Sequence, residues 1–509
     1  MPSLLGIDSG LTVTKAVIFD VDGTPIAVAR RRVTQFMPHA RHVERDMNEL
    51  WTQTADAIRE AIELSGRPAS DIAAIAATAH GDGIYLTDKT NAPLGRALLS
   101  LDSRSVDIVE AWLASPLADE ALELTGQVPH VSAPSALLAW IKKYEPARYK
   151  EIGHILSCKD WLRFCLSGVI GTDRTEASTS FTNVRTQDYD LDALRLFGID
   201  EMASALPPIS RSDEIIGYVT AQTAERTGLA VGTPVVAGLH DVTASALGSG
   251  GYADDVVAVI AGTYSINETL SPHPRMDRRW FCRNAIEPGQ WNNMSISPAS
   301  TANYDWFLDT LCASERQSVE ASGGSVHALL APEIEAAFER PLTALFHPYL
   351  FGSPYGAAAS AGFFGLGGWH NRGDMLRAVL EGIAFNHRIH VDALWDGFTF
   401  SEARLAGGIS RNKRVVQMFA DILGMPATVT ETDEAAAWGA ALCAGAGAGL
   451  YASPRYDPRD AAAIAHRCYP DAARSAAYQE RYDLFREIAD AMAPIWPKIG
   501  KLTAGKPSA

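Results

Sequence analysis

Residues 4–23 of this chain, LLGIDSGLTVTKAVIFDVDG, predict a β-hairpin. Two apolar runs, residues 4–7 and 16–19, flank a polar turn, and the small or charged side chains around this turn are Asp8, Ser9, Gly10, Thr12, Thr14 and Lys15. Such a turn suits either an ordinary hairpin with a polar tip or a cradle for phosphate groups. The rest of the chain has to decide between these two interpretations.

A strand–helix–strand pattern follows the hairpin. Residues 46–66, DMNELWTQTADAIREAIELSG, predict an amphipathic helix that begins after Asp46 and ends before Gly66. The apolar run IAAIAAT at residues 72–78 predicts a buried strand, and AHGDG at residues 79–83 separates it from a second strand. This order predicts an α/β fold with a mostly parallel sheet.

The length of the chain indicates two domains, because 509 residues exceed what one hydrophobic core normally supports. The best internal boundary is GSGGYADD, at residues 248–255. The stretch after it, VVAVIAGTYSINETLS at residues 256–271, repeats the opening order of apolar strand, small and hydroxyl-bearing turn, and second strand. The repeat predicts a duplicated architecture with a ligand held between the two copies.

The composition excludes some function classes. With 47% apolar and 20% charged residues, the chain reads as a soluble globular protein, and its net charge of −16 argues against a nucleic-acid partner. No signal peptide and no convincing membrane span are found, so we expect no membrane partner. The six cysteines lack metal-ligand spacing, which is typical of reduced thiols in a cytoplasmic protein.

Glycine-flanked carboxylates at strand ends are the strongest candidates for chemistry. The chain has no Walker-type G-x-x-x-x-G-K-[ST] motif and no H-E-x-x-H motif. In GTPVVAGLHDVTASALGSG, residues 232–250, Asp241 follows a short strand, at the position where open α/β sheets bind ligands. Asp241 is equally compatible with a helix N-cap, and this stretch alone does not separate the two.

Two further turns carry candidate residues. The stretch AGGISRN, residues 406–412, places Gly407 and Gly408 after a strand and before a helix that ends at Gly424. Paired glycines either allow close approach of a ligand to the backbone or form a tight strand–helix turn. Glu434 precedes a run of small residues and reads as a helix-start carboxylate.

Several of these segments resemble the FGGY family of carbohydrate kinases. The matching segments, in chain order, are CKDWLRFCLSG (158–168), GTDRTEAS (171–178), GTPVVAGLHD (232–241), GFFGLGGWHNRGDMLRAVLEGIAF (362–385) and AGGISRN (406–412). The resemblance covers nearly the whole chain. It implies a two-domain ribonuclease-H/actin-like ATPase fold, with a duplicated mixed-sheet core and a cleft between the domains.

The resemblance also implies a division of labour along the chain. Residues 1–247 are expected to form an N-terminal domain that binds sugar and phosphate and carries the catalytic base. Residues 248–470 are expected to form a nucleotide-binding domain, and residues 471–509 a C-terminal helix and tail. The family's cofactors are ATP and Mg²⁺, so the phosphate-cradle interpretation of the opening turn is the favoured one.

The family's functional residues carry over where positions match. Asp241 would be the catalytic base that accepts the proton of the sugar hydroxyl, and Asp8 would hold Mg²⁺. The residues expected to contact ATP are Gly10, Thr12, Lys15, Gly262 and Thr263 at the phosphates, and Gly407, Gly408, Ser410 and Asn412 at the adenosine.

Substrate choice depends on the segments AHGDG and LLSLDSRS, which look most like those of L-xylulokinases and erythritol kinases. The expected substrate-binding residues are His80, Gly81, Asp82, Asp102, Arg104 and Asp241. The resemblance implies phosphorylation of a terminal hydroxyl of a small ketose such as L-xylulose, with erythritol or another polyol as the alternative. A non-kinase ATPase of the actin or chaperone type is the alternative of another class. We expect the kinase to be a homodimer.

Overall fold

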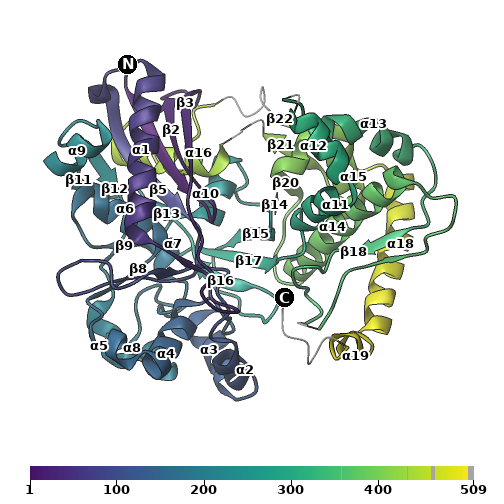
Figure 1. Cartoon of the computed structure of the whole chain (residues 1–509), viewed down its shortest axis with the longest axis horizontal. Helices are drawn as coiled ribbons and strands as arrows, with labels where there is room; N and C mark the ends of the chain where they lie inside the picture. The colour runs from purple at the N-terminus through teal and green to yellow at the C-terminus, as the bar shows by residue number, and fades with distance from the viewer. Residues whose placement is uncertain (322, 357, 431, 433, 460–464, 503–509) are drawn as a thin grey trace. The chain divides into compact units, whose positions relative to one another are not determined.

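The predicted opening hairpin is present in the computed structural model, which describes residues 1–321, 323–356, 358–430, 432, 434–459 and 465–502 (Figure 1). The two strands of the hairpin pair in antiparallel register from Ser3↔Asp20 to Ser9↔Thr14, and they are β1 (Ser3–Ser9) and β2 (Val13–Asp20). Only residues 10–12 lie between them, so the predicted polar tip is a short turn.

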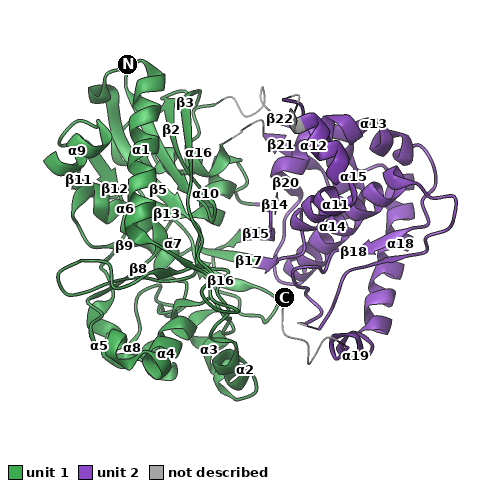
Figure 2. Cartoon of the chain, in the orientation of Figure 1, with its two compact units in different colours: residues 1–254, 270–294, 431–464 green, residues 255–269, 295–430, 465–509 purple. Residues whose placement is uncertain are grey.

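The chain divides into two compact units, and both are discontinuous in sequence (Figure 2). Unit 1 consists of residues 1–254, 270–294 and 431–464, and unit 2 consists of residues 255–269, 295–430 and 465–509. The three-part domain division drawn from the sequence stays a prediction.

Unit 1 is built on a mixed sheet with the strand order β11-β12-β5-β1-β2-β3, in which β13 also pairs with β5. β5 runs parallel to β1, β12 and β13, whereas β2, β3 and β11 run antiparallel to their neighbours. The bounds of the strands not yet given are β3 (Pro25–Arg32), β5 (Ile72–Ala79), β11 (Ile215–Tyr218), β12 (Pro234–Val236) and β13 (Leu239–His240).

Two sets of helices cover the two faces of this sheet. In β1, Leu5 and Ile7 join the apolar core that includes Leu50 and Ile58 of α1 (Met47–Ser65). The alternate residue Gly6 faces α16 (Ala435–Gly447), because a Cβ atom on Gly6 would lie 2.1 Å from the carbonyl oxygen of Ala437. Successive side chains of a strand point to opposite faces, so α1 and α16 lie on opposite sides of β1.

Unit 2 repeats this arrangement. The strands β14 (Val256–Ala261) and β15 (Ser265–Ser271) form an antiparallel hairpin, and β20 (Glu402–Ala406) pairs parallel with β14 as β5 does with β1. On the other side of β15 comes β17 (Trp291–Ser297). The duplication predicted from the sequence is therefore confirmed in the strand topology.

The remaining strands are short or lie at sheet edges. β21 (Ala427–Thr430) and β22 (Ala465–Cys468) extend the sheet beyond β20, and β16 (Phe281–Asn284) pairs with residues 291–294. The others form two-stranded ladders: β4 (Glu44–Arg45), β6 (Tyr85–Thr87), β7 (Ala97–Leu98), β8 (His154–Leu156), β9 (Thr172–Asp173), β10 (Ile209–Ser210), β18 (Leu345–His347) and β19 (Gly362–Phe364).

Helices fill the connections between these strands. Those of unit 1, besides α1 and α16, are α2 (Val106–Leu113), α3 (Leu117–Thr125), α4 (Pro134–Tyr144), α5 (Pro146–Lys150), α6 (Cys158–Ser167), α7 (Arg174–Ala177), α8 (Leu191–Leu196), α9 (Ala221–Thr227) and α10 (Asp241–Gly248). Those of unit 2 are α11 (Ala302–Leu311), α12 (Ala313–Ala321), α13 (Val326–Phe338), α14 (Arg372–Trp395), α15 (Lys413–Leu423), α18 (Ala472–Met492) and α19 (Trp496–Gly500). Among the described residues, no helix combines the length and apolar character needed to cross a membrane.

The helix boundaries read from the sequence agree with the structure. α1 begins after Asp46, whose carboxylate accepts hydrogen bonds from the N–H groups of Asn48 and Glu49. It ends at Gly66, which adopts the left-handed conformation at φ 63°. α15 likewise ends at Gly424, at φ 67°. These capping residues act locally, which is why the sequence alone could locate them.

The close packing of α10 against α16 leads to a prediction about Gly439. A Cβ atom at Gly439 would lie 2.0 Å from the carbonyl oxygen of Ala244. We expect Gly439→Ala to lower the free energy of unfolding by about 1–3 kcal/mol, although alanine favours helix, because the added methyl group overpacks the contact. Urea denaturation measures the change. The matched control is Gly368→Ala, whose Cβ would meet no atom within 4 Å; equal stability of the two variants would contradict this account.

Candidate active site

The turn of the first hairpin presents unpaired backbone donors. The N–H of Gly10 donates to the carbonyl of Val13 at 2.9 Å, and the carbonyl of Thr12 accepts from Val33 at 2.9 Å. The N–H groups of Leu11 and Thr12 make no hydrogen bond within the part of the chain that the structure describes. Neighbouring free N–H groups in a turn suit an anionic ligand.

Asp8 and Lys15 flank this turn and belong to a network of consecutive ion pairs. Nζ of Lys15 lies 3.3 Å from Oδ2 of Asp8 and 3.1 Å from Oε2 of Glu434, and Arg30 also pairs with Glu434. Burial raises the pKa of Asp8, and Lys15 partly opposes that rise. Glu434 stands at the start of α16, but its side chain makes no capping hydrogen bond. Glu434 thus has the helix-start position that the sequence suggested, but its side chain pairs with Lys15 and Arg30 instead of capping the helix.

Asp241 is the first residue of α10, and its neighbour His240 is the cap. Nδ1 of His240 accepts a hydrogen bond from the N–H of Val242 at 3.4 Å, and the N–H of His240 donates to Oγ1 of Thr175 at 2.9 Å. The N-cap alternative for Asp241 is therefore wrong. The carboxylate of Asp241 is left available for another role.

The surroundings of Asp241 raise its pKa to about 7, because burial and the nearby charge of Asp8 both disfavour the ionised form. The N–H groups of Val242 and Gly81 oppose the shift only in part. The side chain keeps 32% of its surface exposed. A carboxyl group that exchanges its proton near neutral pH and stays accessible has the properties of a general base.

The loop after β5 packs directly against His240. A Cβ atom on Gly81 would lie 1.7 Å from Nε2 of His240, so only glycine fits there. The next residue, Asp82, has a positive φ of 54°. Its carboxylate accepts a hydrogen bond from Nη2 of Arg283 at 3.1 Å and lies 3.2 Å from Nε2 of His130. Burial alone would raise the pKa of Asp82, but Arg283 and His130 hold it well below its usual range.

His80 begins the same loop and is neutral. Its Nε2 lies 3.1 Å from the hydroxyl of Tyr85, and its Nδ1 lies 3.4 Å from the carbonyl of Gly81. Burial and the charge of Arg45 lower the pKa of His80 to about 3. Its contact with a substrate stays a prediction.

Asp102 and Arg104 pair with each other. Nε and Nη2 of Arg104 donate to the two carboxylate oxygens of Asp102 at 2.9 Å and 2.8 Å, and Nη2 also donates to Glu44 at 2.8 Å. Asp102 has no exposed surface, and Arg104 keeps 6%. These contacts stabilise the loop before α2, and the assignment of both residues to substrate binding stays a prediction.

A buried polar network supports the start of α10. Nζ of Lys159 lies 2.6 Å from Oδ1 of Asp160 and 2.9 Å from Oδ1 of Asp173. The other oxygen of Asp173 accepts from Oγ1 of Thr175 at 2.7 Å, and Thr175 in turn accepts from the backbone of His240. The motifs CKDW and TDRTEAS thus fix the backbone immediately before Asp241.

Unit 2 brings together its own set of candidate residues. The carbonyl of Gly262, in the turn between β14 and β15, accepts from both the N–H and the hydroxyl of Thr301, at 3.0 Å and 2.7 Å, while Thr263 is exposed. Gly407 has a φ of 105°, and a Cβ atom there would lie 2.2 Å from the carbonyl oxygen of Ala261. The loop after β20 therefore lies against the end of β14.

Gly408, Ser410 and Asn412 belong to this same loop. The Ser410 hydroxyl donates to the carbonyl of Gly407 at 2.7 Å, and Asn412 caps α15 by accepting from the N–H of Arg414 at 2.8 Å. A Cβ atom on Gly408 would meet no atom within 4 Å, so the space over its Cα is open. The adenosine-binding roles of these residues stay predictions.

Three residues at these sites escaped the sequence analysis, Arg45, His130 and Arg283, and a fourth, Glu434, was assigned to a helix start and not to its ion-pair partners. Each contacts a predicted residue that is far from it in the chain; Lys15 and Glu434, for example, are 419 residues apart. None of the four stands in a motif with its partner. The general rule that buried charges are paired suggests that such partners exist, but it does not say which residue each partner is.

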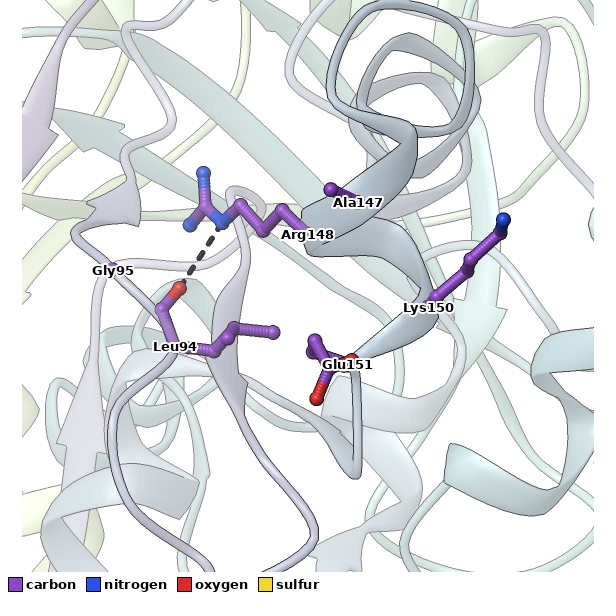
Figure 3. A pocket seen from close by; sticks show the side chains of 6 residues that line it. All are labelled: Leu94, Gly95, Ala147, Arg148, Lys150 and Glu151. Atoms are coloured by element: carbon purple, nitrogen blue, oxygen red, sulfur yellow. Dashed lines mark hydrogen bonds between the residues drawn. The ribbon is translucent and has the colours of Figure 1, made fainter.

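One surface pocket lies outside these residues (Figure 3). Its volume is about 590 Å³, and it is lined by Leu94, Gly95, Ala147, Arg148, Lys150 and Glu151. Arg148 is already engaged there, since its Nε donates to the carbonyl of Leu94 at 3.1 Å. The pocket shares no residue with the predicted site.

Comparison with known proteins agrees with the resemblance seen in the sequence. The N-terminal domain of the FGGY family of carbohydrate kinases matches residues 3–248, and the family's C-terminal domain matches residues 257–448. The L-xylulose/3-keto-L-gulonate kinase of Escherichia coli (strain K12) is 32% identical over 508 residues, covering 98% of this chain and 99% of the relative. The erythritol kinase of Brucella abortus (strain 2308) is 32% identical over 519 residues, with 97% of each chain covered.

A solved structure shows the same fold. The ligand-bound xylulose kinase from Lactobacillus acidophilus matches with a TM-score of 0.87 at 22% identity, over 98% of this chain and 100% of that chain. The two family domains and the full-length relatives define a carbohydrate kinase, an enzyme that transfers a phosphoryl group to an alcohol. The chain belongs to the FGGY family of carbohydrate kinases. Membership of a kinase family decides against the non-kinase ATPase alternative.

The charge around Asp241 leads to a prediction about its titration. We expect the carboxyl group to release its proton at about pH 7, and at lower pH in Asp8→Asn, because that variant loses a neighbouring negative charge. The difference in proton uptake between the wild type and Asp241→Asn, measured by potentiometric titration, isolates this group. Repeating the comparison with Asp8→Asn present in both proteins gives the pKa of Asp241 without the charge of Asp8, and hence the part of the pKa shift that Asp8 causes. A titration near the ordinary aspartate value of about 3.9 would contradict the argument.

Proposed function

We propose that this protein transfers the terminal phosphoryl group of ATP to a terminal hydroxyl of a small ketose, a ketopentose such as L-xylulose. The observation that carries the proposal is the carboxyl group of Asp241. It is accessible, it has no capping role, and its pKa of about 7 allows it to accept a proton near neutral pH. The loop of residues 80–83 beside it supplies polar groups for an acceptor.

The residues around the first turn fit Mg²⁺ and ATP. Within the described part of the chain, no group of three or more His, Cys, Asp or Glu side chains could hold a metal ion. Mg²⁺ often takes only one or two carboxylates and fills its remaining positions with water and phosphate oxygens. Asp8 would be that carboxylate. When bound, the ion neutralises charge on the transferring phosphoryl group.

The chain's own groups would perform the remaining work. The free N–H groups of Leu11 and Thr12 would bind phosphate oxygens, and Lys15 would add a positive charge beside them. Asp241 would accept the proton of the attacking hydroxyl. His80, Gly81 and Asp82 would orient the acceptor. Asp102 and Arg104, which the resemblance assigns to substrate binding, would also stabilise the loop that precedes α2.

The residues of unit 2 would hold the rest of the nucleotide. Gly262 and Thr263 would contact phosphate groups through a second hairpin turn. The open space over Gly408 supports an adenosine site bordered by Gly407, Ser410 and Asn412. The homodimeric state and the cytoplasmic location stay predictions from the sequence.

The choice of acceptor rests on the relatives. The Escherichia coli relative is named for L-xylulose and 3-keto-L-gulonate, which supports a ketose acceptor. The Brucella abortus relative is named for erythritol at the same identity, so a tetritol is the second candidate.

The mechanism predicts a specific loss in Asp241→Asn. Without the base we expect kcat to fall about 10²- to 10⁴-fold, while MgATP affinity and the melting temperature stay nearly unchanged, because His240 caps α10. The matched control is Asp471→Asn, which alters a carboxylate that does cap a helix, α18, and should leave kcat unchanged. Steady-state kinetics, calorimetric titration with MgATP and thermal melting test these expectations. A folded Asp241→Asn protein with normal turnover would overturn the mechanism.

The substrate proposal predicts an order of acceptors. In a coupled assay of ADP release, we expect the highest kcat/KM with L-xylulose among L-xylulose, D-xylulose, L-ribulose, erythritol, ribitol and glycerol. A maximum with erythritol would replace the first candidate by the second. ATP hydrolysis that none of these acceptors stimulates would contradict both.

A further inference from the structure

We propose that Arg45 is a positioning residue of the phosphate turn, with its buried guanidinium fixing the orientation of the turn's N–H groups and supplying a positive charge beneath them. The proposal rests on the proposed function, since it concerns how the turn of residues 10–12 binds the phosphates of ATP. Arg45 lies in β4, outside the hairpin and outside every motif that the sequence analysis singled out.

The contacts of Arg45 are made to carbonyl groups of the turn. The side chain has no exposed surface. Its Nη2 donates to the carbonyl of Gly10 at 3.1 Å and also to the carbonyl of Leu11. One nitrogen atom thus holds two consecutive peptide groups of the three-residue turn.

These contacts determine where the turn's N–H groups point. The carbonyl of Gly10 shares a peptide plane with the N–H of Leu11, and the carbonyl of Leu11 shares one with the N–H of Thr12. In a trans peptide the C=O and N–H bonds point in opposite directions. Because Arg45 draws both carbonyls toward the interior, both N–H groups point away from it. These are the two N–H groups without partners in the described part of the chain.

The charge of Arg45 has no counter-ion in the described residues. No carboxylate there lies within 4.0 Å of its guanidinium, whereas the buried Arg104 and Arg283 both pair with carboxylates. Besides the carbonyls of the turn, Arg45 faces the hydroxyl of Tyr85, at 3.4 Å, the thiol of Cys158, at 4.0 Å, and the neutral ring of His80. Burying an unpaired charge is costly, so a ligand that brings negative charge to the turn would offset that cost.

Variants of Arg45 test the proposal by comparing a charged nucleotide with a neutral nucleoside. Arg45→Met removes both the charge and the hydrogen-bond donors. Arg45→Gln removes the charge but keeps a donor, so it tests the proposal even if Arg45→Met does not fold. We expect MgATP to bind each variant about 10- to 100-fold more weakly, the effect of losing hydrogen bonds to a charged group, and adenosine to bind as it does to the wild type. Isothermal titration calorimetry measures both ligands.

The matched control is Arg163→Met. Arg163 is equally buried and also donates to a backbone carbonyl, that of Gly171, but it lies in α6 and makes no contact with the turn. Its loss should leave the ratio of MgATP to adenosine affinity unchanged.

Several results would overturn the proposal. They are normal MgATP affinity in a folded Arg45 variant, equal weakening of MgATP and adenosine, or an equal change of the ratio in Arg163→Met. A wild-type protein that binds adenosine but no MgATP would instead overturn the proposed function together with this inference. The proposed function stands alone if the wild type binds MgATP and phosphorylates its acceptor while the Arg45 variants bind MgATP equally well.

Discussion

The parallel register of β1, β5 and β13 is the constraint on which the candidate site depends. Asp8 of β1 is aligned with Thr78 of β5, and Ala79 at the end of β5 is aligned with both Ser9 and His240. All three strands therefore end at one edge of the sheet. Hydrogen bonding between the strands fixes their register, and this register brings Asp8, the loop after β5 and Asp241 together at that edge. This edge is where open α/β sheets bind ligands.

Three carboxylates at this edge acquire different properties from their neighbours. Asp82 lies between Arg283 and His130, and it remains ionised. Asp8 has Lys15 beside it, so its charge is partly compensated. Within the described residues, Asp241 pairs with no lysine or arginine, and its one ion-pair partner is His240, whose pKa burial lowers to about 4. The same sheet edge thus supplies an anchored anion, a candidate metal ligand and a candidate base.

The sequence predicted the parts that depend on local chemistry. The hairpin, the caps of α1 and the end of α15 follow from alternation, Asp46 and glycines, and the structure has all of them. Asp241 could be found because it follows a strand within a family motif. The ion pairs of Glu434 and Arg283 could not be found, because their partners lie hundreds of residues away and only the packing of the sheet brings them together. The sequence left the cap of α10 open, because a histidine ring takes a role there that is usual for aspartate.

The duplicated hairpins show how one topology can acquire two electrostatic characters. In both, the carbonyl of the turn's first glycine accepts hydrogen bonds from a supporting residue: that of Gly10 from the guanidinium of Arg45, and that of Gly262 from the backbone and hydroxyl of Thr301. The two supports fix the backbone in a similar way, but only the first adds a charge. A turn supported by a hydroxyl can position its N–H groups without attracting an anion from a distance, whereas a buried cation does both. If the two turns bind phosphate as proposed, the asymmetry gives unit 1, which also carries Asp8 and Asp241, the stronger attraction for it.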